Sequence, residues 1–223
     1  MENKIIIDNQ ALEIYPEIRL ACIRFKTDVK PSSETFWDYL DKTIIPQVKA
    51  NIEGKSWSEI PGVKGSRAAY KAFGRDPTRY RVSSEALLRR VKRGDELYHI
   101  NTVIDVNNMI SIQSGLSLGS YDVDKLSGSI TLRKANEGEG YFGIGKEFLD
   151  MHNLIVIADN EGIFGSTMSD STRAMVTEKT KDILVVIWCF EKEINLEELL
   201  NYAVDAFKEY SNAQDIETWF ENN

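Results

Sequence analysis

The stretch Ile183-Leu-Val-Val-Ile-Trp-Cys-Phe190 decides the fold class that we expect for this chain. It is a continuous apolar run of strand length, rich in β-branched and aromatic residues. Such a run is typical of a strand that is buried on both faces. We therefore predict that residues 183–190 form the central strand of a sheet.

Further strand and helix signals surround this run. Strands are expected at residues 4–7, 19–25, 129–135 and 154–158. Helices are expected to start at Ser32-Ser33-Glu34, to cover Arg67–Phe73, to run from Ser83-Ser84-Glu85 to Gly94, and to follow the Asn195 cap. Residues 100–115 should hold a short buried element, and residues 215–220 an amphipathic tail that docks Trp219 and Phe220. Pro46 is expected to kink or end the first helix.

The order of these elements predicts an α+β fold. The chain of 223 residues contains no repeat, low-complexity tract or linker. We therefore expect one domain over residues 1–223, built from a mixed β-sheet with peripheral helices.

Charge is distributed unevenly along the chain. Residues 64–93 hold ten basic and two acidic residues, a net charge of +8, whereas the whole chain carries −8, so the remainder carries −16. This pattern favours a site for a defined anionic ligand over indiscriminate coating of nucleic acid. A solvated helix face with structural arginines is the alternative, and charge alone does not separate the two.

Several classes of protein do not fit the sequence. No apolar run approaches the roughly 20 residues that span a bilayer, and the charged N-terminus is unlike a signal peptide, so we expect a cytoplasmic protein. Cys22 and Cys189 lie inside apolar runs and are expected to be buried free thiols, with a single disulfide as the alternative. His99 and His152 are the only histidines and no paired-cysteine spacing occurs, so no metal is expected. The chain has no phosphate-binding glycine loop and no Gly-x-Ser-x-Gly motif, and we expect no cofactor.

Two segments are candidates for a binding pocket. Asn101, Asp105, Asn107 and Asn108 are threaded through an apolar run, where polar groups must either fix the backbone or face a ligand. The segment 165–173 is rich in small hydroxyl residues, a composition that suits the rim of a pocket.

The order and spacing of several motifs resemble a known family. The motifs are Asn101-x-Val-x-Asp105-Val-Asn-Asn108, Gly115-Leu-x-Leu-Gly-x-Tyr121-Asp122-Val-Asp124-Lys-Leu126, Leu132-Arg133-x-Ala-x-x-Gly138-Glu139, Ile157-Ala158-Asp159 and Val176-Thr177-x-x-Thr180. Together they resemble the B3/B4 domain, the editing module of the bacterial phenylalanyl-tRNA synthetase beta subunit. The block from Arg67 to Arg90 looks like free-standing members of the same family, and the resemblance covers about residues 60–190.

This resemblance implies a function and a set of site residues. It implies a B3/B4-like fold and a partner, tRNA or aminoacyl-tRNA, whose misacylated ester is hydrolysed in trans by an editing deacylase. Because the sequence shows no counterpart of the synthetase's catalytic core or anticodon-binding domain, we expect that it is not a complete tRNA ligase. The residues expected to contact the ligand or the terminal adenosine are Arg67, Tyr70, Lys71 and Arg81; those expected to supply polar groups to the pocket are Asn101, Asn108, Tyr121 and Ser166; Arg173 is expected to bind a carboxylate, phosphate or sugar. No catalytic residue is assigned.

Five further residues are expected to support the site structurally. They are Asp105, Asp122, Arg133, Glu139 and Asp159, among which an Arg–carboxylate pair beneath the site is expected to be architectural. The chain also departs from the synthetase pattern, because Gly119 stands where the synthetase has a histidine and the glycine-rich acidic loop is replaced by residues 169–173. Two alternatives therefore stay open: a non-catalytic RNA- or amino-acid-binding protein of the same fold, and a subunit of a larger complex.

Overall fold

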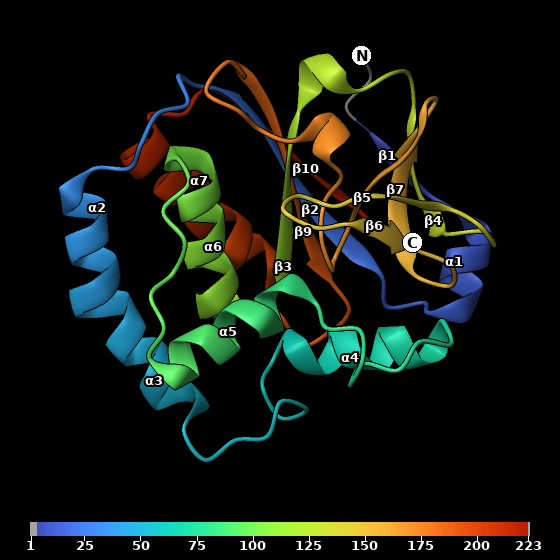
Figure 1. Ribbon diagram of the computed structural model, residues 1–223, viewed down its shortest axis with the longest axis horizontal. Coiled ribbons are helices and arrows are strands. Elements are labelled where there is room, and N and C mark those ends of the chain that lie inside the picture. Colours follow the sequence, from blue (N-terminus) through green and yellow to red (C-terminus); the bar gives the residue numbers. More distant parts are fainter. Residues whose placement is uncertain (1–3, 223) are drawn as a thin grey trace.

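The computed structural model describes residues 4–222, and a four-stranded antiparallel sheet lies at its centre (Figure 1). The strand order is β10-β2-β9-β3, with β2 at Arg19–Lys26, β3 at Ser117–Asp122, β9 at Asp182–Cys189 and β10 at Gln214–Glu221. Strand β9 pairs with β2 on one side and with β3 on the other, from Ser117 opposite Trp188 to Asp122 opposite Ile183. The predicted central position of residues 183–190 is therefore confirmed.

Alternate side chains of β9 enter two different hydrophobic cores. Ile183, Val185 and Ile187 pack with the helices on one face of the sheet, because successive residues of a strand point to opposite faces. Val186 and Trp188 pack on the other face, against a second sheet. The unbroken apolar run at 183–190 thus reflects a strand that is covered on both sides.

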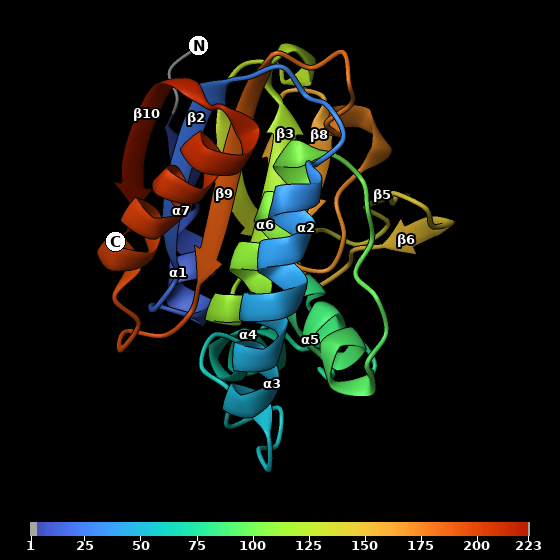
Figure 2. The same cartoon turned by 90° about the vertical axis from the view of Figure 1, so that its left-hand side faces the viewer.

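Helices cover the first face (Figure 2). This layer holds α2 at Glu34–Tyr39, a π-helical turn at Leu40–Ile44, α3 at Ile45–Ile52, α5 at Ser83–Arg93, α6 at Thr102–Ser114 and α7 at Leu196–Ser211. The chain stays helical through Pro46, which lies in the first turn of α3 directly after the π turn. Proline has no backbone N–H with which to donate the i→i−4 hydrogen bond of an α-helix. The π turn before Pro46 accommodates this missing bond, so the helix does not end there.

A second four-stranded sheet covers the other face. Its order is β1-β4-β7-β8, with β1 at Ile5–Ile7, β4 at Ile130–Lys134, β7 at Ile155–Asp159 and β8 at Gly162–Ser166. Only β1 and β4 run parallel among the pairs of this sheet in residues 4–222. The remaining elements are α1 at Asn9–Ile14, α4 at Val63–Ala72, the hairpin of β5 at Gly140–Phe142 and β6 at Phe148–Asp150, and 3₁₀ turns at Val123–Lys125 and Thr172–Ala174.

The α+β class, with peripheral helices around mixed strands, is confirmed, and two segments take a form that the sequence pattern did not specify. Residues 102–114 form a full helix, which shows no amphipathic period because it is buried on most of its circumference. Residues 214–221 form an edge strand paired with β2. Trp219 packs on the second core as expected, whereas the docking expected of Phe220 is wrong, because its side chain is 42% exposed.

Two expectations about the chain as a whole can also be compared with the structure. Cys22 and Cys189 are both free and buried, and they lie in cores on opposite faces of the central sheet, which confirms the prediction of two thiols. In residues 4–222, none of the helices is both long enough and apolar enough to cross a membrane.

Candidate functional site

A cavity of about 350 Å³ lies where α6, β3, the end of β8 and the β5–β6 hairpin meet. Its apolar wall comes from four separate segments and consists of Ile100, Ile104, Leu118, Ile144, Met175 and Val176. Its polar side chains are those of Ser83, Asn107, Asn108, Ser120, Ser166, Ser169 and Asp170. An apolar wall with a few convergent polar groups is the usual composition of a small-molecule site.

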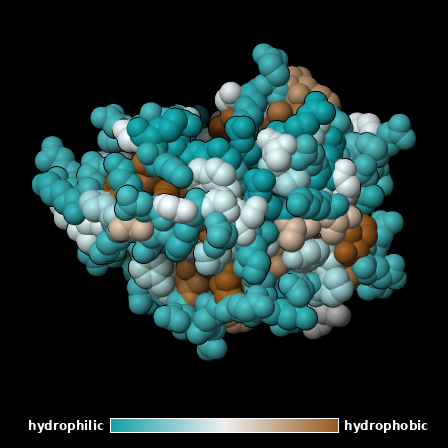
Figure 3. All heavy atoms as spheres, turned by 90° about the horizontal axis from the view of Figure 1, so that it is seen from below, coloured by the Kyte–Doolittle hydropathy of each residue, from teal (hydrophilic) through white to brown (hydrophobic). Residues whose placement is uncertain are grey.

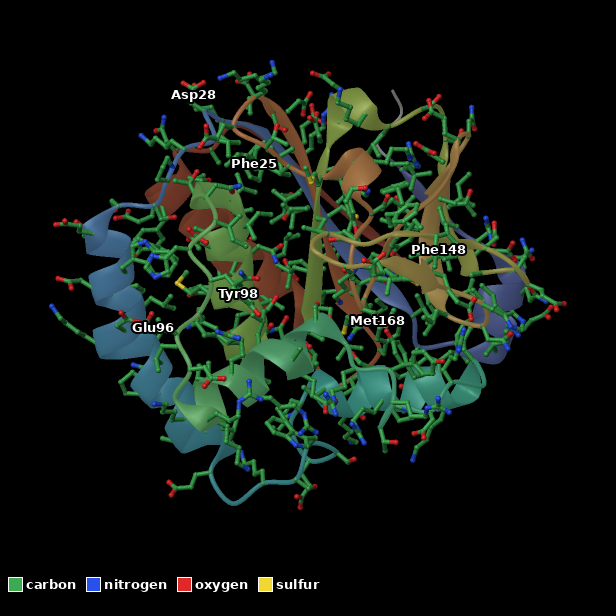
Figure 4. All side chains as sticks on the ribbon, in the orientation of Figure 1. Phe25, Asp28, Glu96, Tyr98, Phe148 and Met168 are labelled. Carbon is green, nitrogen blue, oxygen red and sulfur yellow. The ribbon has the colours of Figure 1, made fainter. Side chains whose placement is uncertain are left out.

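Exposed apolar side chains gather on the segments around this cavity. Ile100 and Ile144 are 52% and 45% exposed, although both contribute to the wall. Tyr98, on the segment before α6, and Phe148, on β6, are each 54% exposed and are labelled in Figure 4. An apolar rim of this kind marks a surface that meets a ligand or a partner more often than it marks a bare loop.

Helix α6 and strand β3 fix part of the polar floor together. The Ser120 hydroxyl donates to the Asn107 amide oxygen at 2.8 Å, and the Asn107 nitrogen lies 3.4 Å from the Leu118 carbonyl. Asn107 is therefore held by the protein, whereas the Asn108 side chain has no hydrogen-bond partner within residues 4–222 and lines the same cavity. An amide in that position can donate to, and accept from, a bound ligand.

Asp170 carries the one ionisable side chain among the described residues that line the cavity. Its Oδ1 accepts a hydrogen bond of 2.6 Å from the Tyr121 hydroxyl. Burial raises the pKa of Asp170 to about 7, against the opposing effects of the Tyr121 hydrogen bond, the Ser166 backbone and the Lys146 charge. Burial likewise lowers the pKa of Lys146, against the attraction of Asp170. The site can therefore exchange a proton near neutral pH.

Two glycines make room for the Tyr121 ring. A Cβ atom at Gly119 would lie 2.0 Å from the Tyr121 hydroxyl oxygen, and one at Gly165 would lie 2.2 Å from it. The phenol is thus held between β3 and β8, with Asp170 at its tip. Gly119 is therefore a packing requirement of this tyrosine.

The hydroxyl-rich loop after β8 is held by its own hydrogen bonds. The Ser166 hydroxyl donates to the Ser169 carbonyl at 3.0 Å and accepts from the Met168 and Ser169 backbone N–H groups. The Tyr141 phenol lies 2.5 Å from the same carbonyl. Ser166 therefore shapes the loop that presents Asp170 as well as lining the cavity.

The structure separates the predicted ligand contacts into groups. Asn108 and Ser166 line the cavity. Tyr121 does not line it, but its hydroxyl donates a hydrogen bond to Asp170, which does. Asn101 is the N-cap of α6, where its side chain accepts from two backbone N–H groups, and Tyr70 is buried with its hydroxyl 2.8 Å from that of Thr167.

The predicted basic contacts do not line the cavity. Arg67 forms an ion pair of 2.9 Å with the buried Glu85, and Arg173 forms one of 2.8 Å with Asp159. Lys71 and Arg81 are exposed and form no ion pair within residues 4–222. Seen from the side of α4, the surface is mainly hydrophilic and is interrupted by small apolar patches (Figure 3). Whether any of these cations binds a ligand stays a prediction.

The predicted supporting residues each have protein partners. Asp105 accepts from Ser32 and from the Ile100 backbone, and burial raises its pKa. Asp122 accepts from Thr180 at 2.8 Å. Arg133 and Glu139 form a half-buried pair of 2.6 Å, and Asp159 accepts from Arg173 and from two backbone N–H groups. These contacts are the ones an architectural role requires.

Sequence reasoning placed Asn107 and the segment that holds Ser169 and Asp170 among the pocket candidates without assigning them ligand contacts, and it did not select Ser83 or Ser120; all five line the cavity. For Asp170 a signal was present, because it is an acidic residue among small neutral ones in the segment 165–172. Its partner Tyr121 lies 49 residues away, so the pair itself could not be foreseen from spacing. Within residues 4–222, no group of three or more His, Cys, Asp or Glu side chains is placed to hold a metal ion.

Comparison with known proteins assigns the fold family. The B3/4 domain family matches residues 65–210, about two thirds of the chain. The chain belongs to the B3/4 domain family. All the residues that line the cavity fall within the matched range.

Relatives of this B3/4 protein include phenylalanine–tRNA ligase beta subunits. The one from Bifidobacterium longum is 30% identical over 146 residues, which are 62% of this chain and 17% of that protein. The one from Cutibacterium acnes is 39% identical over 89 residues, which are 38% of this chain and 10% of that protein. The chain therefore spans only a small part of the length of these relatives.

A solved structure is also similar. It is an N-terminal fragment of the phenylalanyl-tRNA synthetase beta subunit from Pyrococcus horikoshii, with a TM-score of 0.48 and 13% identity, and the match covers 99% of this chain and 54% of that one.

Proposed function

We propose that this B3/4 protein binds the aminoacyl end of tRNA in the cavity and hydrolyses the ester of misacylated tRNA in trans. The observation that carries the proposal is that the B3/4 match includes every residue of the cavity wall. The named relatives are phenylalanine–tRNA ligase beta subunits, with which this chain aligns over 89 and 146 residues. Charged tRNA is found in the cytoplasm, which is where we place the reaction.

The cavity has the size and chemistry that an aminoacyl group needs. A volume of about 350 Å³ is at the small end of ligand sites and suits one amino-acid side chain with its ester. The apolar wall suits an apolar side chain, and the Asn108 amide can donate to the oxygen that becomes negative when water attacks the ester carbonyl. The Ser120 hydroxyl donates to Asn107 and keeps acceptor capacity with which to orient that water.

Exposed basic residues in the segment of the chain that leads to Ser83 support the binding of the tRNA end. Arg81 is exposed and lies two residues before Ser83, which lines the cavity. Lys71 and Arg79 are also exposed, on α4 and on the turn that follows it. Cations in these positions can contact the phosphates that precede the aminoacyl group.

The test is a deacylation panel. The full chain is incubated at low salt with tRNAs charged with matched and mismatched amino acids, and release of the amino acid is measured. At least one mischarged tRNA should be hydrolysed faster than its correctly charged counterpart. Asn108→Ala should lower that rate about 100-fold, the usual effect of losing an oxyanion donor. Asn201→Ala, an exposed asparagine on α7, is the matched control and should leave the rate unchanged.

The panel can also contradict the proposal. If no mischarged tRNA is hydrolysed at high protein concentration, the deacylase function is wrong. If in that case tRNA or an amino-acid ligand still binds, the non-catalytic binding protein of the same fold becomes the better explanation.

A further inference from the structure

The charge of the cavity distinguishes between two classes of ligand. Its lining holds one carboxyl group, that of Asp170, and the described residues of the lining include no cationic side chain. The rest of the lining is neutral, with an apolar wall and small hydroxyl or amide groups. A ligand that fits this lining has a positive group for Asp170, an apolar body for the wall, and no negative group close to either.

The Asp170 carboxylate has few partners of its own. The Tyr121 hydroxyl donates to Oδ1, and the Tyr141 phenol and the Lys146 ammonium are the other titratable groups whose charges it feels from the neighbouring strands and hairpin. Within residues 4–222, Asp170 forms no ion pair with a lysine or an arginine; Lys146, on the hairpin turn, does not reach ion-pair distance, although its charge lowers the pKa of Asp170. A ligand ammonium group would supply the close positive partner that the fold does not.

We propose that Asp170 binds the α-ammonium group of an amino acid whose carboxyl group is esterified or amidated, and that the cavity excludes free amino acids. The proposal rests on the proposed function, since an aminoacyl-tRNA is such an ester. In the ester, the carboxyl carbon carries no charge, whereas a free amino acid brings a carboxylate within a few bonds of the ammonium group. In a partly buried site that second carboxylate is repelled by Asp170 and finds no cation in the lining.

Discrimination of this kind has a clear use for a protein that acts on charged tRNA. Free amino acids would compete for the same apolar wall if only the side chain were recognised. A single carboxylate with no cationic neighbour in the lining rejects them without any contact to the side chain. It also rejects N-acylated amino acids, which lack the ammonium group.

The raised pKa of Asp170 gives the binding a characteristic pH dependence. With a pKa of about 7, much of the carboxyl group is protonated at pH 6, and a bound ammonium group favours the charged form. Binding should therefore strengthen as the pH rises from 6 to 7.5. It should weaken again when the ligand amine, with a pKa near 7.7–8.0, loses its proton.

The experiment is a comparison of small ligands by isothermal titration calorimetry on the full chain. The probes are the amides of L-leucine, L-valine and L-phenylalanine, the three free amino acids, and the three N-acetyl amides. We expect at least one amide to bind at pH 7.5 at least tenfold more tightly than its free amino acid and its N-acetyl amide. Asp170→Asn should remove this preference, and the exposed Asp41→Asn on the helical layer should keep it.

Several outcomes would overturn the inference. Equal or tighter binding of the free amino acids, unchanged amide binding by Asp170→Asn, or no binding of any amide at 10 mM each would do so. The comparison of ligands on the unmodified chain needs no variant and stands even if Asp170→Asn does not fold. Deacylation without a preference for amides would contradict this inference and leave the proposed function intact. A preference for amides without deacylation would contradict the deacylase function and leave the binding of the ammonium group by Asp170 supported.

Discussion

The basic segment at residues 64–93 and the cavity between α6, β3 and β8 use their polar groups in opposite ways. In the basic segment, Glu85 is almost fully buried and holds both Arg67 and Arg89, at 2.9 and 2.8 Å. In the cavity, which both Asn108 and Asp170 line, neither side chain forms an ion pair within residues 4–222, and Asp170 is held by a single neutral donor, the Tyr121 hydroxyl. A cluster of charge in a sequence therefore marks the frame of this protein, whereas isolated polar residues in apolar surroundings mark its candidate site.

The strongest test of this comparison is to remove the carboxylate at the centre of the basic segment. Glu85→Gln leaves Arg67 and Arg89 without their shared partner, and breaking a buried pair costs about 3–5 kcal/mol. Urea unfolding should show a loss near the lower limit, because Arg89 is 31% exposed. Asp95→Asn, which breaks the exposed pair with Arg93, should cost under about 1 kcal/mol. A Glu85→Gln protein of normal stability that lost activity would show that the frame and the site are not separate.

The second test concerns the cavity, where removing the carboxylate of Asp170 is expected to stabilise the fold and not to destabilise it. Because the folded pKa of Asp170, about 7, lies above its ordinary value of 3.8, the group favours folding when protonated and disfavours it when charged. Its contribution is present below about pH 4 and is lost as the pH rises through 7. The difference in unfolding free energy between Asp170→Asn and the unmodified chain should therefore shift in favour of the variant by about 2–3 kcal/mol as the pH rises from 5 to 8, measured by urea unfolding. A stability difference that does not change with pH would contradict the raised pKa.

The third test addresses the tyrosine that holds Asp170. Gly119→Ala places a Cβ atom against the Tyr121 hydroxyl and should cost about 1–3 kcal/mol, as overpacking usually does. In a Tyr121→Leu background the same substitution should cost much less, because the ring that it meets is gone. Equal costs in both backgrounds would mean that Gly119 is required for another reason.

The smallest expected effect lies on two exposed cations of the basic segment, which do not line the cavity. Replacing Lys71 and Arg81 by glutamine should flatten the dependence of tRNA binding on salt by about 0.7 log units per lost phosphate contact. Fold stability should not change, because both side chains are exposed. Lys208→Gln on α7 is the control and should leave the salt dependence as it was. An unchanged slope in the double variant would remove these two residues from the tRNA path.

The sequence predicted the parts of this molecule whose signals are local. The run at 183–190 and the Asn195 cap depend on neighbouring residues, and β9 and α7 formed there. Helix α6 was seen only as a buried element, because a helix covered on most sides loses its apolar period.

For the candidate site, the pattern located segments better than side chains. The segments around Asn108 and Ser166 do meet in one cavity, whereas Arg67 turns to Glu85. Partner choice of this kind depends on contacts 18 and 49 residues apart, for Arg67 with Glu85 and Tyr121 with Asp170, and no local pattern encodes them.

The β5–β6 hairpin contributes a wall that the two large sheets do not hold. Ile144 at its turn lines the cavity, and the hairpin is attached to the loop after β8 by the Ile144 N–H to Asp170 carbonyl bond of 3.1 Å and by the Gly143–Ser171 bridge. A change in the length or bulk of this turn would alter the cavity without touching the two cores on the faces of the central sheet, because the hairpin packs instead on a third, smaller cluster through Tyr141 and Leu149. The shape of the cavity thus depends on a short turn whose length can change independently of the two large sheets.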